Sequence, residues 1–313
     1  MRAQRGDPGM EDFLWSSVEQ DDKETALILE VLIQLYVSTY RLPRALDALN
    51  LFLGRQPNDV QALLGRGWVW EQFFYFANAV ADYHRAVEVD PENDAARLRL
   101  AETLLVTGPA SAALDQFELL WQRQPEKPAV LLGLARCRRQ LGQLNDARSG
   151  LDGLLARLPS ETPDKDAAVL SERGRLALDE RKPAQAERWL RQAVALAPYD
   201  RQTNYNLYQC LQQQGRTDEA CRCRVTFERI DADLIRIDNV LKEVLRAPYD
   251  PAPRSEAGVI FLRNGEPEKG LRWLSMALQQ DPWHGPTHRA LANHYQRTGR
   301  LDLAARHRQL GER

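Results

Sequence analysis

Prolines recur along this chain at a spacing of 34 residues. The spacing separates Pro57, Pro91, Pro125 and Pro159, and it separates Pro248 from Pro282. Proline ends a helix because it lacks an amide donor and restricts the residue before it. A period of roughly 20 to 50 residues is typical of arrays in which each unit packs on the next. The spacing therefore predicts a series of 34-residue helical units. The longer gaps between prolines are explained by insertions, of which "SETPD" is the clearest.

Other positions of the unit are restricted in size when the proline is numbered 32. Position 20 is small throughout: Ala45, Ala79, Ala113, Ala147, Ala186, Ala220, Gly270 and Ala304. Position 8 is small in most units: Gly67, Ala101, Ala135, Gly174, Gly258 and Ala292. Small side chains let two antiparallel helices approach closely. Position 24 is mostly bulky and apolar, and it shares a helix face with position 27, so it can pack against the next unit.

This pattern resembles the tetratricopeptide repeat family over about residues 26 to 313. The clearest unit has Gly67, Ala79, Tyr83, Ala86 and Pro91 in place. The resemblance implies an all-α fold, a right-handed superhelical solenoid of about seven or eight antiparallel helix hairpins. A solenoid of this kind is better described as one cooperative array than as separate domains.

The repeats divide the chain into expected segments. The first, residues 1–25, is an N-terminal tail with a lead-in helix, and the units are about 26–59, 60–93, 94–127, 128–159, 167–200, 201–250, 251–284 and 285–313. Two residues depart from the pattern: Arg97 replaces a bulky apolar residue at position 4, and Ala232 replaces the proline of repeat six. The second helix of repeat six is therefore predicted to run beyond Ala232.

A stack of such hairpins presents its first helices on a concave face. In the resembled family that face commonly receives an extended peptide or a partner's helix. The expected groove residues are Trp68, Arg99, Glu102, Arg136, Arg139, Glu172, Arg175, Gln202, Tyr205, Asn206, Gln209, Arg263, Arg289 and Asn293. Arginine and aromatic side chains often dominate recognition when they are clustered and desolvated. The alternative is that these charges only keep a concave surface hydrated.

The chaperone-binding members of the family hold a terminal carboxylate through lysine, asparagine and arginine at fixed positions. Of the five positions, only Arg99 carries a suitable residue here, while Glu30, Gln34, Gly65 and Ala95 occupy the others. That clamp is therefore disfavoured. The aromatic run "GWVWEQFFYF" is interpreted mostly as packing, with Trp68 as the best candidate for exposure.

Catalytic and metal-binding signals are weak. His284 and His288 are four residues apart, but Gly285 and Pro286 lie between them, and no acidic ligand follows at a suitable spacing, so a solvated terminal cap is favoured. Cys221 and Cys223 are too close in sequence to act as a zinc or redox pair on one helix face. No phosphate-binding glycine loop or nucleophile elbow occurs. We expect a chain that is not an enzyme and has no cofactor.

Charge and hydropathy restrict the partners. The formal net charge is -2, which provides no general attraction to nucleic acid or to an anionic membrane. No run of about 18 apolar residues is present, and the first twenty residues lack the apolar core of a secretion signal. These features favour a cytoplasmic protein that binds a protein or peptide.

Three alternatives remain. The array could be the regulatory arm of a larger enzyme or of a secretion or assembly machine. It could bind RNA, as related 35-residue helical repeats do, although the charge balance argues against this. Finally, apolar residues from Phe227 to Val244 follow the 3-4 spacing of a coiled coil, so this helix could form a homodimer or pack within the chain.

Overall fold

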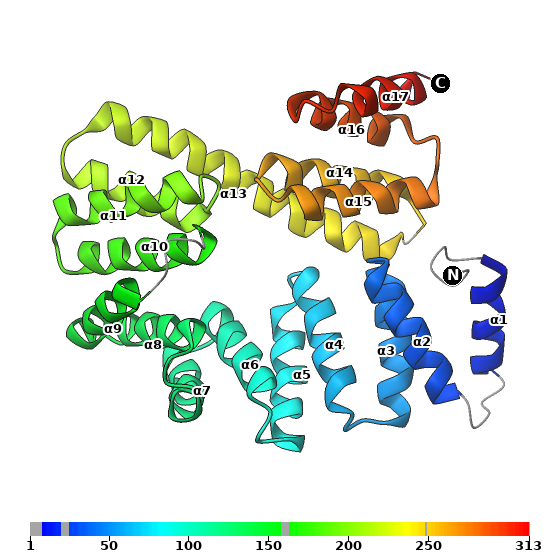
Figure 1. Cartoon of the computed structure of the whole chain (residues 1–313), viewed down its shortest axis with the longest axis horizontal. Helices are drawn as coiled ribbons and strands as arrows, with labels where there is room; N and C mark the ends of the chain where they lie inside the picture. Colours follow the sequence, from blue (N-terminus) through cyan, green and yellow to red (C-terminus); the bar gives the residue numbers. More distant parts are fainter. Residues whose placement is uncertain (1–7, 20–24, 158–162, 248, 313) are drawn as a thin grey trace. The chain divides into compact units, whose positions relative to one another are not determined.

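The computed structural model describes residues 8–19, 25–157, 163–247 and 249–312, and over these ranges it contains α-helices and no strand (Figure 1). The helices are α1 (Pro8–Glu19), α2 (Thr25–Ser38), α3 (Leu42–Arg55), α4 (Val60–Gln72), α5 (Phe76–Val89), α6 (Asp94–Thr107), α7 (Ala110–Arg123), α8 (Pro128–Gln140), α9 (Leu144–Arg157), α10 (Pro163–Asp179), α11 (Pro183–Leu196), α12 (Arg201–Gln213), α13 (Thr217–Arg246), α14 (Pro251–Arg263), α15 (Pro267–Gln280), α16 (Gly285–Arg297) and α17 (Leu301–Gly311). From α2 onward, each even-numbered helix is followed by a partner of the same hairpin. The predicted fold of stacked helix hairpins is confirmed.

The chain divides into two compact units. Unit 1 contains residues 1–90 and 236–313, and unit 2 contains residues 91–235. Unit 1 therefore joins the first hairpins to the last ones, and unit 2 holds α6 to α12 with the first part of α13. Residues 1–7 and 20–24 of the predicted N-terminal segment 1–25 lie outside the described residues, as do Pro159, part of the "SETPD" insertion and Pro248.

The turn inside most hairpins depends on one residue with a left-handed backbone, at position 15 of the unit. Gly142, Gly215, Gly265 and Gly299 adopt this conformation, with φ between 72° and 79°. Glycine has no Cβ and adopts it without strain. Tyr40, Phe74 and Arg181 take the same role with φ near 59°. Several first helices then begin at a side-chain cap, as where Asp200 accepts a hydrogen bond from the amide of Thr203 at 2.7 Å.

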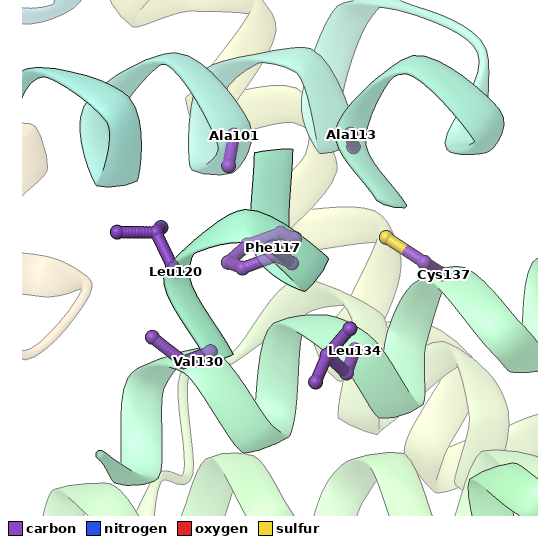
Figure 2. Close-up of a cluster of buried hydrophobic side chains, with 7 residues drawn as sticks. All are labelled: Ala101, Ala113, Phe117, Leu120, Val130, Leu134 and Cys137. Carbon is purple, nitrogen blue, oxygen red and sulfur yellow. The ribbon is translucent and has the colours of Figure 1, made fainter. Parts of the chain in front are cut away.

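The predicted packing positions form the core. Every alanine at position 20 is 3% exposed or less, and the bulky residues at position 24 are 1% exposed or less. Figure 2 shows one resulting cluster, in which Phe117 of α7 lies among side chains of α6 and α8. This cluster also contains Cys137, and burial raises the pKa of its thiol to about 12. Cys137 is thus a core side chain.

The small residues at position 8 make room for the bulky residues at position 24. A Cβ added to Gly67 would lie 2.5 Å from the Tyr83 ring, and one added to Gly174 would lie 2.6 Å from Leu190. Gly133, at position 6 of its unit, packs in the same way against Phe117 of the preceding hairpin. At Gly67 and Gly174 the close approach is thus between glycine and a large side chain, whereas Gly258 and Gly270 lie against each other as expected from their positions 8 and 20.

Within unit 1, the first hairpin contacts residues more than 200 positions later. The ring of Tyr40 packs edge-on against Trp273 with centroids 5.8 Å apart. Arg44 donates a hydrogen bond to the hydroxyl of Tyr249, where the end of α13 comes close to α3 (Figure 1). Burial raises the pKa of Tyr40 to about 12. These contacts join hairpin α2–α3 to α15 and to the segment that follows α13.

Helix α13 runs for 30 residues and continues past Ala232, as predicted. Along its apolar stripe, Ile230, Ile237, Leu241 and Val244 are 2% exposed or less, whereas Leu234 is 38% exposed. Most of the stripe therefore packs within the chain. A homodimer seam along it would first have to uncover these side chains.

Candidate functional site

The first helices of unit 2 line a hollow of about 600 Å³. Its walls come mainly from α6, α8, α10 and the start of α12. The residues predicted from sequence that line it are Glu102, Arg136, Glu172, Arg175 and Gln202. Apolar side chains complete the walls, among them Leu105, Val106, Leu132 and Ala168. The hollow is therefore partly apolar and partly charged, as a site for a peptide side chain would be.

A network of ion pairs lies beside this hollow. Arg139 is 6% exposed and donates hydrogen bonds to Glu172 and, at 2.9 Å, to Asp179. Arg136 approaches the other oxygen of Glu172 at 3.6 Å. Burial lowers the pKa of the Arg139 guanidinium, but the charges and hydrogen bonds of Glu172 and Asp179 outweigh burial and raise it overall. Arg139 thus holds α8 against α10, and its guanidinium is largely committed to that role.

Arg175 makes no direct contact in this network. It is half-buried on α10, and it has neither a hydrogen bond nor an ion pair to any residue that the structure describes. Burial and the neighbouring charge of Arg139 lower the pKa of Arg175, while the charges of Glu172 and Asp179 offset this only in part. A guanidinium stays charged at neutral pH. Arg175 therefore brings a charge without a direct partner to the edge of the hollow.

Polar residues of α12 extend the same face. Gln202 donates a hydrogen bond to Asn206 at 2.8 Å, and Gln209 donates one to the hydroxyl of Tyr205 at 2.9 Å. Tyr205 also packs against Phe227, with centroids 5.0 Å apart. Asn206 is 3% exposed, and its Nδ2 has no hydrogen-bond partner among the described residues. Of these four, only Gln202 lines the hollow.

The remaining expected groove residues lie outside the lining of this hollow. Arg99 lies on α6 with its guanidinium 3.8 Å from Glu102. Unit 1 contains Trp68, Arg263, Arg289 and Asn293. Among these, Trp68 is half-buried and packs edge-on against Tyr40, with centroids 6.1 Å apart. It lines a separate, shallower hollow of unit 1 together with Lys269 and Arg272.

Sequence reasoning missed the apolar part of the hollow in unit 2. Val106 is 66% exposed at the end of α6, and Leu105 lies beside it. Both belong to the short apolar run 104–106 that directly follows the buried Thr103, so the pattern alone does not separate them from the core. Ser171 and Thr203 join α10 to α12 at the hollow, with their hydroxyl oxygens 2.6 Å apart.

The histidines of the last hairpin are arranged differently from the expectation. His288 is 3% exposed rather than solvated, because its Nε2 lies 3.0 Å from the Pro282 carbonyl and its Nδ1 lies 2.9 Å from Nδ1 of His307. Across the described part of the chain, no group of three or more histidine, cysteine or acidic residues is placed to hold a metal ion. The helices within those same ranges are each too short or too polar to cross a membrane.

The fold and the hollow define an α-helical repeat protein built from hairpins. Two stretches, residues 76–123 and 108–170, match tetratricopeptide repeat models. The chain thus carries tetratricopeptide repeats, which confirms the resemblance noted from its residues.

Individual proteins with solved structures or curated sequences are more distant. The fold is similar to that of PilW, a widely conserved type IV pilus biogenesis factor, with a TM-score of 0.52 and 14% identity over 66% of this chain and 94% of that one. MamA of Desulfovibrio magneticus RS-1 gives a TM-score of 0.48 and 16% identity, covering 55% of this chain and 94% of MamA. The cellulose synthase 1 operon protein C of Komagataeibacter xylinus is 26% identical over 211 residues, which are 67% of this chain but 14% of that protein. The repeats support a protein-interaction scaffold.

Proposed function

We propose that this chain is a non-catalytic scaffold that binds a peptide segment or a partner helix on the first helices of unit 2. The hollow lined by α6, α8, α10 and α12 is the observation that carries the proposal. Its volume of about 600 Å³ is large enough for one or two side chains of a partner, and its walls offer both apolar contact and charge.

The ion pairs beside the hollow support the same function. Arg139 and Glu172 fix α8 and α10 relative to each other, so the hollow is held in shape before a partner arrives. A site that is already shaped loses less conformational entropy on binding. The partner would therefore bind a hollow in which Arg139 is already held in place by its ion pair.

A site-specific photo-cross-link tests this function. A benzoylphenylalanine introduced at Val106, at the hollow, should cross-link a partner in cells that naturally contain the protein. The same residue at Leu119, which is 40% exposed on α7, is the matched control. We expect a cross-linked partner from Val106 and none from Leu119. Equal yields from both positions, or a partner captured only from Leu119, would contradict the proposed site.

A second candidate function is an arm of a larger assembly machine. The relative from Komagataeibacter xylinus is a cellulose synthase operon protein, and the aligned stretch is 14% of its length. Under this hypothesis the partner captured from Val106 would be a subunit of such a machine. Mass spectrometry of the cross-linked product distinguishes this case from a free cytoplasmic partner.

A further inference from the structure

We propose that Arg175 anchors an acidic side chain of the partner, with an aliphatic neighbour of that side chain seated in the apolar part of the same hollow. This inference rests on the proposed function, because it names the chemistry that the groove of unit 2 would recognise.

Each acidic group near the hollow already has a compensating contact. Glu172 is shared by Arg139 and Arg136, and Asp179 accepts a hydrogen bond from Arg139. At the other end, Asp200 accepts hydrogen bonds from the amide and the hydroxyl of Thr203 at the start of α12. A helix N-terminus carries partial positive charge, which further stabilises that carboxylate.

Glu102 completes the acidic set, since it lies 3.8 Å from the guanidinium of Arg99. Arg175 is then the charged group at the hollow that lacks a direct partner within the described residues. An incoming carboxylate could accept two parallel hydrogen bonds from its guanidinium. The same carboxylate would compensate a charge that the folded chain leaves partly desolvated.

The apolar wall determines what should stand next to the carboxylate. Leu105, Val106, Leu132 and Ala168 line the hollow together with Arg175. An aliphatic side chain seated against them would remove apolar surface from water on both sides. A partner with leucine, isoleucine or valine next to aspartate or glutamate therefore fits both parts of the hollow.

Selection from a random peptide library tests the anchor. The peptides are displayed at the N-terminus of a phage coat protein, so that none has a free C-terminal carboxylate. Three full-length proteins serve as bait: the wild type, Arg175→Glu and Ala168→Trp, each first shown by circular dichroism to be helical. We expect the wild type to enrich an acidic residue beside an aliphatic one, Arg175→Glu to enrich a basic residue instead, and Ala168→Trp to enrich neither.

Synthetic amidated peptides then measure the pairing itself. Replacing the enriched acid by its amide should weaken binding to the wild type by about tenfold or more, as for a charged hydrogen bond. The same replacement should have little effect on binding to Arg175→Gln, because the two changes remove one interaction. An equal effect on both proteins would overturn the anchor.

These experiments distinguish failure of the proposed Arg175 anchor from failure of the proposed binding groove. Peptides that lose binding to Ala168→Trp but show no acidic preference would overturn the anchor and leave the groove standing. Peptides indifferent to both variants, or no enriched peptide at all, would overturn the anchor and the proposed groove together.

Discussion

Polar residues at position 4 of several repeats bind the carbonyl at the end of the preceding unit. Arg97 donates a hydrogen bond to the Pro91 carbonyl at 2.7 Å, and Asn204 donates one to that of Pro198 at 3.0 Å. His288 makes the equivalent contact with Pro282. A buried carbonyl without a partner would be destabilising. Arg97, which departs from the repeat pattern, therefore has a structural role at the junction between hairpins.

The glycine at position 133 tests the packing at the residue scale. Gly133→Ala would place a Cβ about 2.2 Å from the Phe117 ring, so α7 and α8 must separate. We expect a loss of about 1 to 3 kcal/mol in the free energy of unfolding. The control is Gly153→Ala on α9, where a Cβ meets nothing within 4 Å and alanine favours the helix. Denaturant unfolding of both variants checks this, and an equal response would contradict the packing argument.

The buried ion pair gives a second prediction at this scale. Arg139→Met would leave Glu172, which is 5% exposed, with the 3.6 Å contact from Arg136 as its one remaining ion pair within the described residues. Breaking a buried pair costs about 3 to 5 kcal/mol of folding free energy. Arg175→Met, which breaks no such pair, should leave the free energy of unfolding within about 0.5 kcal/mol of the wild type. Thermal unfolding distinguishes them, and a larger loss from Arg175→Met would refute the assignment of roles.

At the scale of elements, the last hairpin should respond to pH. Burial and the charges of His288 and Arg306 lower the pKa of His307, and burial with Arg297 and Arg300 lowers that of His294. A histidine whose pKa is lowered in the folded state binds fewer protons there than in the unfolded chain. The neutral forms of His294 and His307 therefore contribute fully to the stability of hairpin α16–α17 above about pH 6.5, the pKa of histidine in the unfolded chain. This contribution is lost as the pH falls below that value.

Hydrogen exchange of α16 and α17 between pH 8 and pH 5 measures this effect. After correction for the intrinsic dependence of exchange on pH, protection should fall below about pH 6.5. His307→Phe removes one titrating group and should flatten the change. Protection that stays constant in the wild type would show that the histidine contacts do not control the hairpin.

The elements of this fold were largely predictable from the sequence, while the hollow was only partly so. Recurrent small residues and prolines define where each hairpin begins and ends, because each acts on its own helix or on the neighbouring one. The absence of a proline at Ala232 likewise predicted the long helix α13. The partition of roles between Arg139 and Arg175 was not predictable. Both were expected on the inner face. Only the structure shows that Arg139 is buried in ion pairs with Glu172 and Asp179, whereas Arg175 is half-buried and makes no such pair within the described residues.

At the scale of the whole molecule, unit 1 depends on contacts between the two ends of the sequence. Tyr40 packs against Trp68 and Trp273 and donates a hydrogen bond to Gln72 at 2.8 Å. Repeat positions could not predict the contact with Trp273, because each repeat pattern describes only neighbouring units. Hairpins far apart in sequence should therefore lose stability together when Tyr40 is removed.

Tyr40→Ala should reduce the free energy of unfolding of unit 1 by about 3 to 5 kcal/mol, as for other large buried rings. Hydrogen-exchange protection should fall in both α2–α3 and α14–α15. Leu27→Ala, at a position on α2 that is 62% exposed, is the matched control and should change neither hairpin. A loss confined to α2–α3 would contradict the coupling between the two ends.

If the first helices of unit 2 hold the partner, binding should slow hydrogen exchange on those helices. Hydrogen exchange of the full chain is therefore compared with and without the partner cross-linked from Val106 or an enriched peptide. We expect added protection in α6, α8, α10 and α12 and unchanged exchange in α7, α9 and α11. Protection in α7, α9 and α11, or confined to unit 1, would contradict it.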